Sequence, residues 1–283
     1  MNNQVILSDN LVALKNIPDE SVNLIFIDPP YNKGFKRIGI KTITERNEIG
    51  VTGFGGNKYI REEIITQSYE DDYGDSYISF MKERIVESYR ILKNNGSFYL
   101  IADYSEIHYL KVMCDGIFGR ENYRGSVYWN WDFGAKATKN YPNKVNEILY
   151  YVKGDNFTWN YLQLPTIPYM SKGGLIPKEK LERGKRLTNC WFISIEGTNS
   201  KERKLYSYPT MKPQKLLSHI ITTSSNEGDI CLDFFAGGGS FGQACFDKNR
   251  KFIMIDSNIE AYNVMKKRFE NQDVEFIGLS SQD

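Results

Sequence analysis

A carboxylate followed by two prolines and a tyrosine stands early in the chain, at Asp28-Pro29-Pro30-Tyr31. The apolar run Asn23–Ile27 predicts a buried strand, which places Asp28 at a carboxyl edge, where α/β proteins bind ligands. The prolines fix their own φ and lack N–H groups, so the backbone carbonyls here point outward without a ladder to join. A carboxylate, a carbonyl and an aromatic ring suit a planar molecule that bears an –NH₂ group. The alternative is an ordinary strand-ending turn.

A glycine-rich segment, Phe235–Gly242, follows another predicted strand and opens a helix, a context in which a nucleotide-like ligand approaches backbone. The segment also fits the dinucleotide pattern G-x-G-x-x-G, but the 41 residues after Gly242 are too few for a second nucleotide-binding half. Asp233, just before the loop, would repel a pyrophosphate and attract an ammonium or sulfonium group. Asp256, at the end of the next strand, can accept both ribose hydroxyls. The combination favours S-adenosylmethionine over NAD.

The elements that must position these motifs alternate between strand and helix. Hydrophobic patterns predict strands at Val5–Ser8, Asn23–Ile27, Ser97–Ala102, Val127–Trp131, Glu147–Lys153, Ile230–Phe234, Phe252–Ile255 and Val274–Ile277. Helices are predicted at Asn10–Asn16, Tyr77–Leu92, Ser105–Ile117 (capped by Ser105), Lys212–Thr223, Ser240–Lys248 and Asn258–Phe269. This order predicts an α/β fold with a mainly parallel sheet and helices on both faces. Residues 33–75, glycine-rich and without a period, predict a long loop without regular elements.

Composition sets outer bounds on function. With 283 residues, 41% hydrophobic and 25% charged, the chain resembles ordinary soluble proteins. It has neither an apolar run long enough to span a bilayer nor a secretory signal at its start. The four cysteines are widely spaced and there are two histidines, which argues against a zinc site or a disulfide framework. We therefore expect a cytoplasmic protein with no metal and no membrane partner.

The net charge of +1 conceals local asymmetry. Residues 33–61 carry seven basic and two acidic side chains, and residues 62–75 carry six acidic and no basic ones. Residues 171–215 carry eleven basic and four acidic side chains, a net of +7. Two separate basic segments favour binding to a polyanion, although charged runs are also common on solvated loops.

Together, Asp28-Pro29-Pro30-Tyr31 and the later glycine loop resemble the motifs of the β-class (permuted) DNA amino-methyltransferases, adenine-N6 type. Further elements resemble that family at Ser8-Asp9-Asn10, Asn146-Glu147 and Tyr208-Pro209-Thr210-Met211-Lys212-Pro213. The resemblance implies a Rossmann-like methyltransferase fold with circularly permuted motif order. Residues 1–153 would form the catalytic half (33–75 a mobile loop), 154–207 an inserted target-recognition region and 208–283 the cofactor-binding half.

The resemblance implies transfer of a methyl group from S-adenosylmethionine to N6 of a flipped adenine in double-stranded DNA, in a restriction-modification or regulatory setting. It assigns catalysis to Asp28, Pro29, Pro30 and Tyr31, whose ring would stack on the base. Asp233 would hold the methionine ammonium and Lys212 the methionine carboxylate. The remaining cofactor contacts would come from Asp9, Asp28, Phe235, Gly237, Gly239, Ser240 and Asp256. DNA contacts are expected from Lys33, Lys36, Arg37, Lys185, Arg186, Lys201, Arg203 and Lys204.

Several alternatives stay open on the sequence. The nearest is a cytosine-N4 DNA methyltransferase, against which Asp28 in place of serine favours adenine. An RNA or protein-glutamine methyltransferase, a dehydrogenase and a catalytically inactive DNA-binding module are more distant. Besides double-stranded DNA, a second copy of the chain and a cognate restriction endonuclease are candidate partners.

Overall fold

The computed structural model describes residues 2–34, 37–52, 58–69, 71–134, 137–170, 174, 176–195, 201–206, 208 and 211–278. At residues 37–52, 59–69, 201, 203 and 204 the description covers the backbone only. The chain divides into two compact units. The larger comprises residues 1–31 and 75–283, and the smaller is Asn32–Gly74.

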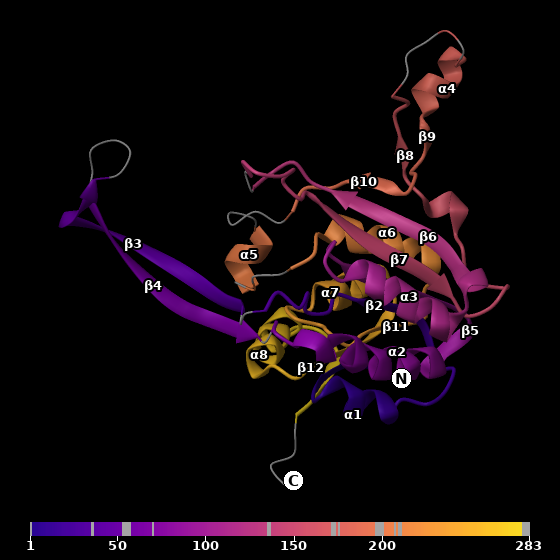
Figure 1. Ribbon diagram of the computed structural model, residues 1–283, viewed down its shortest axis with the longest axis horizontal. Coiled ribbons are helices and arrows are strands. Elements are labelled where there is room, and N and C mark those ends of the chain that lie inside the picture. The colour runs from indigo at the N-terminus through magenta and orange to yellow at the C-terminus, as the bar shows by residue number, and fades with distance from the viewer. Residues whose placement is uncertain are drawn as a thin grey trace. The chain divides into compact units, whose positions relative to one another are not determined.

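The larger unit is built on a nine-stranded sheet in the order β10-β6-β7-β5-β2-β11-β12-β1-β13 (Figure 1). All neighbouring strands are parallel except the pairs β5–β7 and β6–β7. The strands are β1 (Asn3–Leu7), β2 (Val22–Ile27), β5 (Leu92–Ala102), β6 (Tyr123–Asn130), β7 (Val145–Val152), β10 (Cys190–Phe192), β11 (Ile230–Asp233), β12 (Lys251–Asp256) and β13 (Val274–Ile277).

Helices pack on both faces of this sheet. On one face α1 (Asn10–Lys15), α2 (Tyr77–Ile91) and α3 (Ile107–Phe118) lie in contact with one another, and Phe118 packs against Phe98. On the other, α6 (Gln214–Ser224), α7 (Ser240–Phe246) and α8 (Ile259–Arg268) share one core with alternate strand residues. Every residue of β2 is buried, as expected of a central parallel strand covered on both faces. The predicted fold class is confirmed.

The first and last parts of the chain meet at the centre of the sheet. Strand β2 pairs in parallel with β11, with Leu24 opposite Cys231 and Ile25 opposite Leu232. From β11 the sheet continues to β12 on one side, and from β2 it continues to β5 on the other. The carboxyl ends of neighbouring parallel strands form the edge at which α/β proteins bind their ligands. Asp28 follows β2 and Asp233 ends β11, so both carboxylates belong to this edge.

Two predicted helix starts are wrong by two residues: α6 begins at Gln214 and not at Lys212, with Pro213 as its N-cap, and α3 begins after Ser105. Helix α3 begins at Ile107, and Ser105 does not cap it. Asp103 organises the turn instead: its carboxylate accepts from the Ser105 N–H (3.1 Å), and its carbonyl accepts from the Ile107 N–H (3.1 Å). An aspartate can form this turn as well as a serine can, so the pattern did not distinguish them.

The smaller unit corrects a second expectation, because residues 33–75 do contain regular elements. Strand β3 (Arg37–Thr52) pairs antiparallel with β4 (Lys58–Tyr69) in a two-stranded ladder. Its base is closed by hydrogen bonds from Gly34 N to Asp71 O (3.0 Å) and from Tyr73 N to the Asn32 side chain (2.9 Å). The β-branched residues of both segments favour strands, and each strand supplies the other's partner. Mobility of this hairpin stays a prediction.

Residues 154–207 include short elements: β8 (Thr166–Ile167), α4 (Lys178–Arg183), β9 (Lys185–Arg186) and α5 (Lys201–Tyr206). Strands β8 and β9 pair antiparallel, and with α4 they extend from the end of the sheet near β10 (Figure 1). Single-turn 3-10 helices lie at Gly74–Ser76, Arg120–Asn122 and Tyr161–Gln163. In the described part of the chain, no helix has the length and apolar character needed to cross a bilayer.

His219 on α6 makes stability depend on pH. Burial lowers its pKa from 6.5 to about 4, with Lys215 and Lys248 adding to the effect, and its ring packs edge-on against Trp191 at 5.4 Å. The folded protein therefore prefers the neutral imidazole, while the unfolded chain takes up a proton below pH ~6.5. We expect stability to fall as the pH drops from about 6.5 towards 4. Urea unfolding at several pH values should show a smaller fall in His219→Gln; an equal fall would contradict the assignment.

Candidate active site

Three carboxylates stand at the carboxyl ends of adjacent strands. Asp28 follows β2, Asp233 ends β11 and Asp256 ends β12. Burial raises the pKa of Asp233 well above its ordinary value, and the charges of Asp28 and Asp256 raise it further, against the opposing Phe235 N–H and Lys212 ammonium. A group that brings positive charge to Asp233 would relieve this cost. The arrangement fits the ammonium and sulfonium of S-adenosylmethionine and disfavours a pyrophosphate.

Asp256 ties the glycine loop to the end of β12. Its Oδ2 accepts from the Gly237 N–H (2.8 Å) and its Oδ1 from the Asn258 N–H (2.9 Å). Burial raises its pKa, and the two N–H groups oppose the shift. A carboxylate has about four lone-pair sites, so Asp256 can still accept the two hydroxyls of a ribose.

The glycine loop is one in which side chains would not fit. Gly237 and Gly239 have φ of +50° and +76°, which L-residues with a Cβ rarely adopt. A Cβ on Gly238 would lie 2.9 Å from the Tyr208 Cβ, and a Cβ on Gly239 would lie 2.8 Å from the Met265 Cγ. Tyr208 and α8 therefore pack directly against the backbone of this loop and leave no room for side chains at Gly238 and Gly239. Ser240 then begins α7 as a buried residue.

Asp28 is the centre of a polar network. Its Oδ1 accepts from the Tyr31 hydroxyl (2.8 Å) and its Oδ2 from the Lys212 ammonium. The Tyr31 oxygen in turn accepts from the Asn146 side-chain amide (3.2 Å). Asn146 was singled out from the sequence only for its resemblance to a family motif, and the structure shows that it holds the tyrosine. The Asp28 carboxylate and the Tyr31 phenol, both just after β2, therefore meet the Lys212 ammonium from the loop before α6 and the Asn146 amide from β7.

The two proline carbonyls differ in their partners. The Tyr77 hydroxyl donates to the Pro30 carbonyl (2.6 Å), which fixes the turn after β2 against the start of α2. In the described residues no donor to the Pro29 carbonyl is found. The Pro29 carbonyl, in the residue after Asp28, is therefore left as an acceptor, and its contact with a ligand stays a prediction.

Lys212 forms a salt bridge with Asp28. The pair is largely buried, with side-chain exposures of 12% and 16%, and the ammonium stands 6.0 Å from the centre of the Tyr31 ring. The sequence interpretation placed Lys212 on the methionine carboxylate, a contact that stays a prediction. Since an ammonium has three donors, one residue can bind both Asp28 and a ligand carboxylate.

Asp9, expected near the adenine ring, has an evident structural role. Its Oδ1 accepts from the Leu11 and Val12 N–H groups (2.9 and 3.2 Å) and caps α1, while its Oδ2 pairs with Arg84 (3.0 Å). The neighbouring Asn10 donates to the Phe234 carbonyl (2.8 Å), which joins the first helix to the end of β11. These contacts explain the Ser8-Asp9-Asn10 element by architecture, and its contact with a ligand stays a prediction.

Arg268 was not singled out from the sequence. Its side chain is 1% exposed; it donates to the Gly238 carbonyl (2.7 Å), to Glu202 (2.7 Å) and to the Met211 sulfur (3.3 Å). The guanidinium also lies 4.0 Å from the centre of the Tyr206 ring. Arg268 thus ties the glycine loop to α5 and to the residue before Lys212. A basic residue at the end of a helix is common on sequence grounds, so no pattern marked it.

Replacing Arg268 tests this connection. Arg268→Met is expected to lower the free energy of unfolding by about 3 kcal/mol, because Glu202 is left with an unpaired, mostly buried charge. Adding Glu202→Gln should restore part of the loss. Urea unfolding of the single and double variants measures both values, and strictly additive losses would show that the two residues act independently.

The residues expected to bind DNA lie in different surroundings in the structure. Lys185 lies 5.9 Å from the centre of the Tyr169 ring. Arg186 donates to the carbonyls of Leu162 (3.1 Å) and Leu164 (2.6 Å), so its guanidinium braces the segment around β8 and β9. Lys33 belongs to the smaller unit. Lys36, and the side chains of Arg37, Lys201, Arg203 and Lys204, lie outside the described residues.

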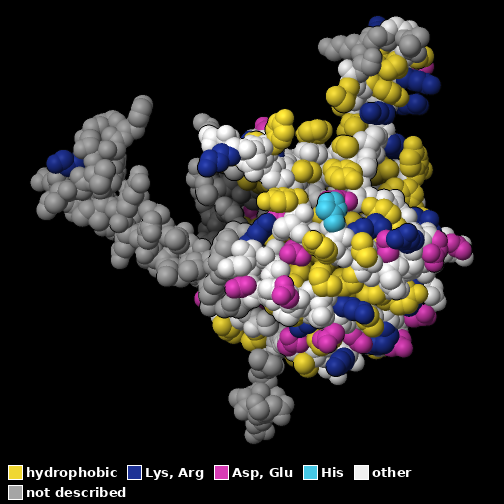
Figure 2. Space-filling view, viewed as in Figure 1, with side chains coloured by type: hydrophobic (Ala, Val, Ile, Leu, Met, Phe, Trp, Pro, Cys, Tyr) yellow, Lys and Arg dark blue, Asp and Glu magenta, His cyan; other side chains and the backbone are white. Residues whose placement is uncertain are grey.

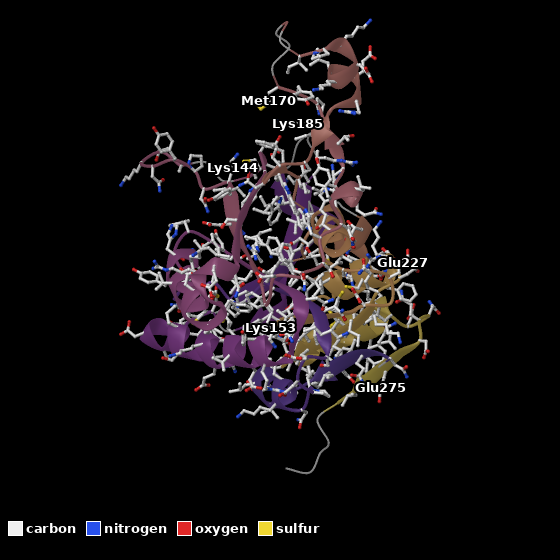
Figure 3. All side chains as sticks on the ribbon, turned by 90° about the vertical axis from the view of Figure 1, so that its right-hand side faces the viewer. Lys144, Lys153, Met170, Lys185, Glu227 and Glu275 are labelled. Atoms are coloured by element: carbon white, nitrogen blue, oxygen red, sulfur yellow. The ribbon has the colours of Figure 1, made fainter. Side chains whose placement is uncertain are left out.

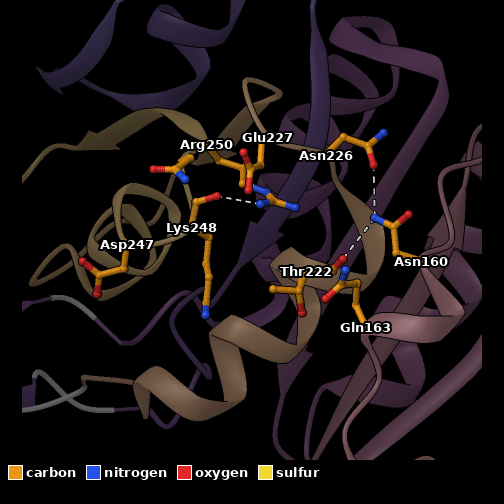
Figure 4. Close-up of a pocket in the computed structure, with 9 residues that line it drawn as sticks. Asn160, Gln163, Thr222, Asn226, Glu227, Asp247, Lys248 and Arg250 are labelled. Atoms are coloured by element: carbon orange, nitrogen blue, oxygen red, sulfur yellow. Dashed lines mark hydrogen bonds between the residues drawn. The ribbon is translucent and has the colours of Figure 1, made fainter.

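A separate polar pocket lies at the opposite edge of the sheet, before β11 and β12. It is lined by Asn160, Gln163, Thr222, Asn226, Glu227, Asp247, Lys248, Asn249 and Arg250 (Figure 4). Its central groups bond to the protein: the Asn160 amide donates to Thr222 O (3.1 Å) and Arg250 donates to Lys248 O (2.6 Å). We assign it no chemistry. In the described part of the chain, no three His, Cys, Asp or Glu side chains lie close enough to hold a metal ion.

Over residues 22–267 the sequence matches a family described as DNA methylase. The chain belongs to this family. It is 30% identical to the Type II methyltransferase M.HpaI of Haemophilus parainfluenzae, over 100% of this chain and 78% of the relative. It is 31% identical to the DNA adenine methyltransferase YhdJ of Escherichia coli K12, over 94% of this chain and 82% of the relative.

Solved structures of DNA methyltransferases share the fold. The PvuII DNA methyltransferase, described as cytosine-N4-specific, aligns with a TM-score of 0.60 at 17% identity, over 99% of this chain and 96% of that one. M1.HpyAVI in complex with SAM aligns with a TM-score of 0.57 at 19% identity, over 94% and 98%. The expected Rossmann-like fold is confirmed, and this methylase is an S-adenosylmethionine-dependent DNA methyltransferase. The dehydrogenase alternative is thereby excluded.

Proposed function

We propose that the methylase transfers the methyl group to N6 of an adenine extruded from double-stranded DNA. The observation that carries this proposal is the pair of acceptors at the end of β2. The Asp28 carboxylate and the Pro29 carbonyl belong to consecutive residues, and the described residues supply no donor to the latter. An exocyclic –NH₂ has two hydrogens to donate. The name of the relative YhdJ, a DNA adenine methyltransferase, favours adenine over cytosine.

The acceptors would act on the geometry of the amino group. The N6 lone pair is delocalised into the adenine ring, so planar N6 is a poor nucleophile. Hydrogen bonds to Asp28 and to the Pro29 carbonyl draw N6 towards tetrahedral geometry and stabilise the positive charge that develops there. Bound S-adenosylmethionine supplies the electrophilic methyl group. Tyr31 stacks on the base, and its hydroxyl, held by Asn146, keeps the Asp28 carboxylate in register.

The cofactor contacts are assigned to the loops around the three carboxylates. Asp233 holds the ammonium, Lys212 the carboxylate and Asp256 the ribose, with Asp9 on the adenine side. Phe235, Gly237, Gly239 and Ser240 line the loop beneath the cofactor. In this arrangement Lys212 touches both Asp28 and the methionine carboxylate, so cofactor binding draws the lysine partly away from Asp28 and frees acceptor capacity for the base.

Affinity for DNA is assigned to the two basic segments. In residues 154–207, Lys178, Lys180 and Arg183 of α4 are exposed, and Figure 2 shows Lys and Arg side chains on the surface of this part. Lys33, Lys36, Arg37, Lys185, Lys201, Arg203 and Lys204 are proposed as further phosphate contacts, and Arg186 as a brace for them. The hairpin within residues 33–75 is proposed to become ordered on the substrate. Because each neutralised phosphate adds about one unit to the salt dependence, binding should weaken steeply with salt.

The wider setting follows from the names of the relatives. M.HpaI is named a Type II methyltransferase, so we propose a cognate restriction endonuclease that cuts the same DNA sequence when it is unmethylated. A cytoplasmic location fits a DNA substrate. A homodimer is proposed as well, and light scattering of the purified protein would test it.

Expression in a host that lacks adenine methylation tests the proposal. Sequencing that detects modified bases should find N6-methyladenine at one short DNA sequence, absent from cells expressing Asp28→Ala. N4-methylcytosine in its place would make the cytosine alternative correct. Genomic DNA that stays unmodified, although purified protein binds S-adenosylmethionine, would overturn the DNA assignment.

A further inference from the structure

The connection between β6 and β7 comprises the fourteen residues 131–144, which we call the β6–β7 loop. Its two ends are held together where they leave the sheet. The Trp131 N–H donates to the Lys144 carbonyl (3.2 Å), and the Lys144 ammonium donates to the Asp132 carbonyl. Lys144, labelled in Figure 3, is the last residue of the loop and immediately precedes β7. These hydrogen bonds fix the base of the loop.

The β6–β7 loop rejoins the sheet at the active site. Strand β7 begins at Val145, and the next residue, Asn146, donates to the hydroxyl of Tyr31 (3.2 Å). Asn146 is itself 8% exposed and paired in register with Trp129 of β6. The five residue-to-residue steps from Tyr141 to Asn146 span at most about 17 Å when the chain is fully extended. The end of the loop is thus tied to the side chain on which the flipped base is proposed to stack.

The exposed side chains in the described part of the loop include two aromatic rings and a lysine, together with the acidic Asp132. The Tyr141 side chain is 98% exposed and the Phe133 side chain 72%, and Lys139 is exposed between them. A ring that is exposed to this extent adds nothing to the core. A lysine beside an aromatic ring is the combination that proteins use to reach a phosphate backbone and then stack on bases.

Base flipping leaves a gap in the duplex that an aromatic side chain of this loop could fill. When a base leaves the duplex, the stacking on both of its neighbours is lost, and proteins commonly insert an apolar or aromatic side chain between base steps. The active site described above contains the group that receives the base, Tyr31. It contains no group that fills the space left in the duplex, because Asp28, Pro29 and Lys212 all belong to the receiving site.

We propose that the β6–β7 loop enters the duplex beside the target and that Tyr141 fills the space vacated by the flipped base. Lys139 contacts a phosphate next to it. Tyr141 is favoured over Phe133 because it is almost fully exposed and because its side of the loop leads to Asn146 and Tyr31. The inference rests on the proposed function, since it assumes extrusion of a base from DNA.

The experiment measures flipping and methyl transfer separately, in the full-length enzyme with a duplex of the mapped target sequence. Flipping is followed by the fluorescence of 2-aminopurine at the target position, with S-adenosylhomocysteine bound. Single-turnover methylation is measured on the natural duplex. Tyr141→Ala should reduce both the fluorescence rise and the methylation rate about tenfold, a loss within the range for one base–aromatic stack. Tyr141→Phe should retain most of both, because the ring is kept.

Controls separate a wedge from a general loss. Tyr109 on α3 is 66% exposed outside the loop, and Tyr109→Ala should behave as wild type in both measurements. Binding of S-adenosylhomocysteine by Tyr141→Ala should change less than about twofold. A mismatched base opposite the target makes extrusion less costly, so the defect of Tyr141→Ala should shrink on that duplex.

Two results would overturn the inference while leaving the proposed function intact. The first is that Tyr141→Ala flips and methylates the target at the same rate as an active wild-type enzyme. The other is a larger defect in Phe133→Ala than in Tyr141→Ala, which would assign the wedge to the other ring. If the wild-type enzyme neither methylates the duplex nor raises the fluorescence, the proposed function itself fails.

Discussion

Asp28→Asn is expected to slow methyl transfer by about a thousandfold and to change the dissociation constant for S-adenosylmethionine less than about threefold. The substitution keeps the volume of the side chain and removes the charge that stabilises the developing cation on N6. Losing one preorganised electrostatic contact of this kind costs up to about 10³ in rate. The amide can also turn its NH₂ towards the substrate amino group, where two donors would oppose each other. A single-turnover assay at saturating DNA measures the rate, and calorimetry measures cofactor binding.

A matched variant shows whether the charge or the network is responsible. Tyr31→Phe keeps the ring and removes the hydrogen bond to Asp28 Oδ1. It should cost only about tenfold, the equivalent of one ordinary hydrogen bond of about 1.4 kcal/mol. An Asp28→Asn enzyme that transfers methyl groups within tenfold of wild type would rule out the proposed role of the carboxylate. So would a Tyr31→Phe enzyme that is as slow as Asp28→Asn.

Asp233→Asn is expected to weaken S-adenosylmethionine binding by about a hundredfold. A hydrogen bond between two charged partners contributes about 1.5–3 kcal/mol, and the buried Asp233 is the carboxylate assigned to the ammonium. The variant retains an oxygen for the Phe235 N–H, which donates to Asp233 at 2.9 Å in the wild type. Isothermal titration calorimetry measures the constant. Asp247→Asn, a change at an exposed position at the far edge of the sheet, is the control and should bind normally.

The same substitution should make the ligand-free protein more stable. Burial raises the pKa of Asp233 above its value in the unfolded chain, so ionised Asp233 favours unfolding at neutral pH. A neutral asparagine removes that cost, and thermal melting without ligand should move upward. The wild type should release protons when it binds S-adenosylmethionine, because the cation favours the ionised carboxylate, and its affinity should rise with pH. Calorimetry in buffers of different ionisation enthalpy detects this release; no difference between buffers would contradict it.

The local pattern of the sequence was enough for the fold class and for the place of the motifs. The residues of β2, β11 and β12 are apolar runs that end in an acidic residue, and helical periods separate them. Because parallel strands bring their carboxyl ends to one edge, Asp28, Asp233 and Asp256 could be expected at a common site before any coordinates were known. Hydrophobic periodicity and the residues that end a strand are local properties of the sequence. They can therefore be recognised without knowledge of the tertiary structure.

The partners of those side chains were decided only by the tertiary structure. Lys212 meets Asp28 across 184 positions of sequence, and Asn146 meets Tyr31 across 115. Arg268 and Arg186 show the same limit, since one holds the glycine loop and the other braces a segment expected to bind DNA. The β3–β4 hairpin was missed because the segment is rich in glycine and shows no sustained period along the chain, whereas the two strands are paired with each other by backbone hydrogen bonds. Hydrogen bonds, ion pairs and raised pKa values depend on distance and burial in space, which a spacing along the chain does not specify.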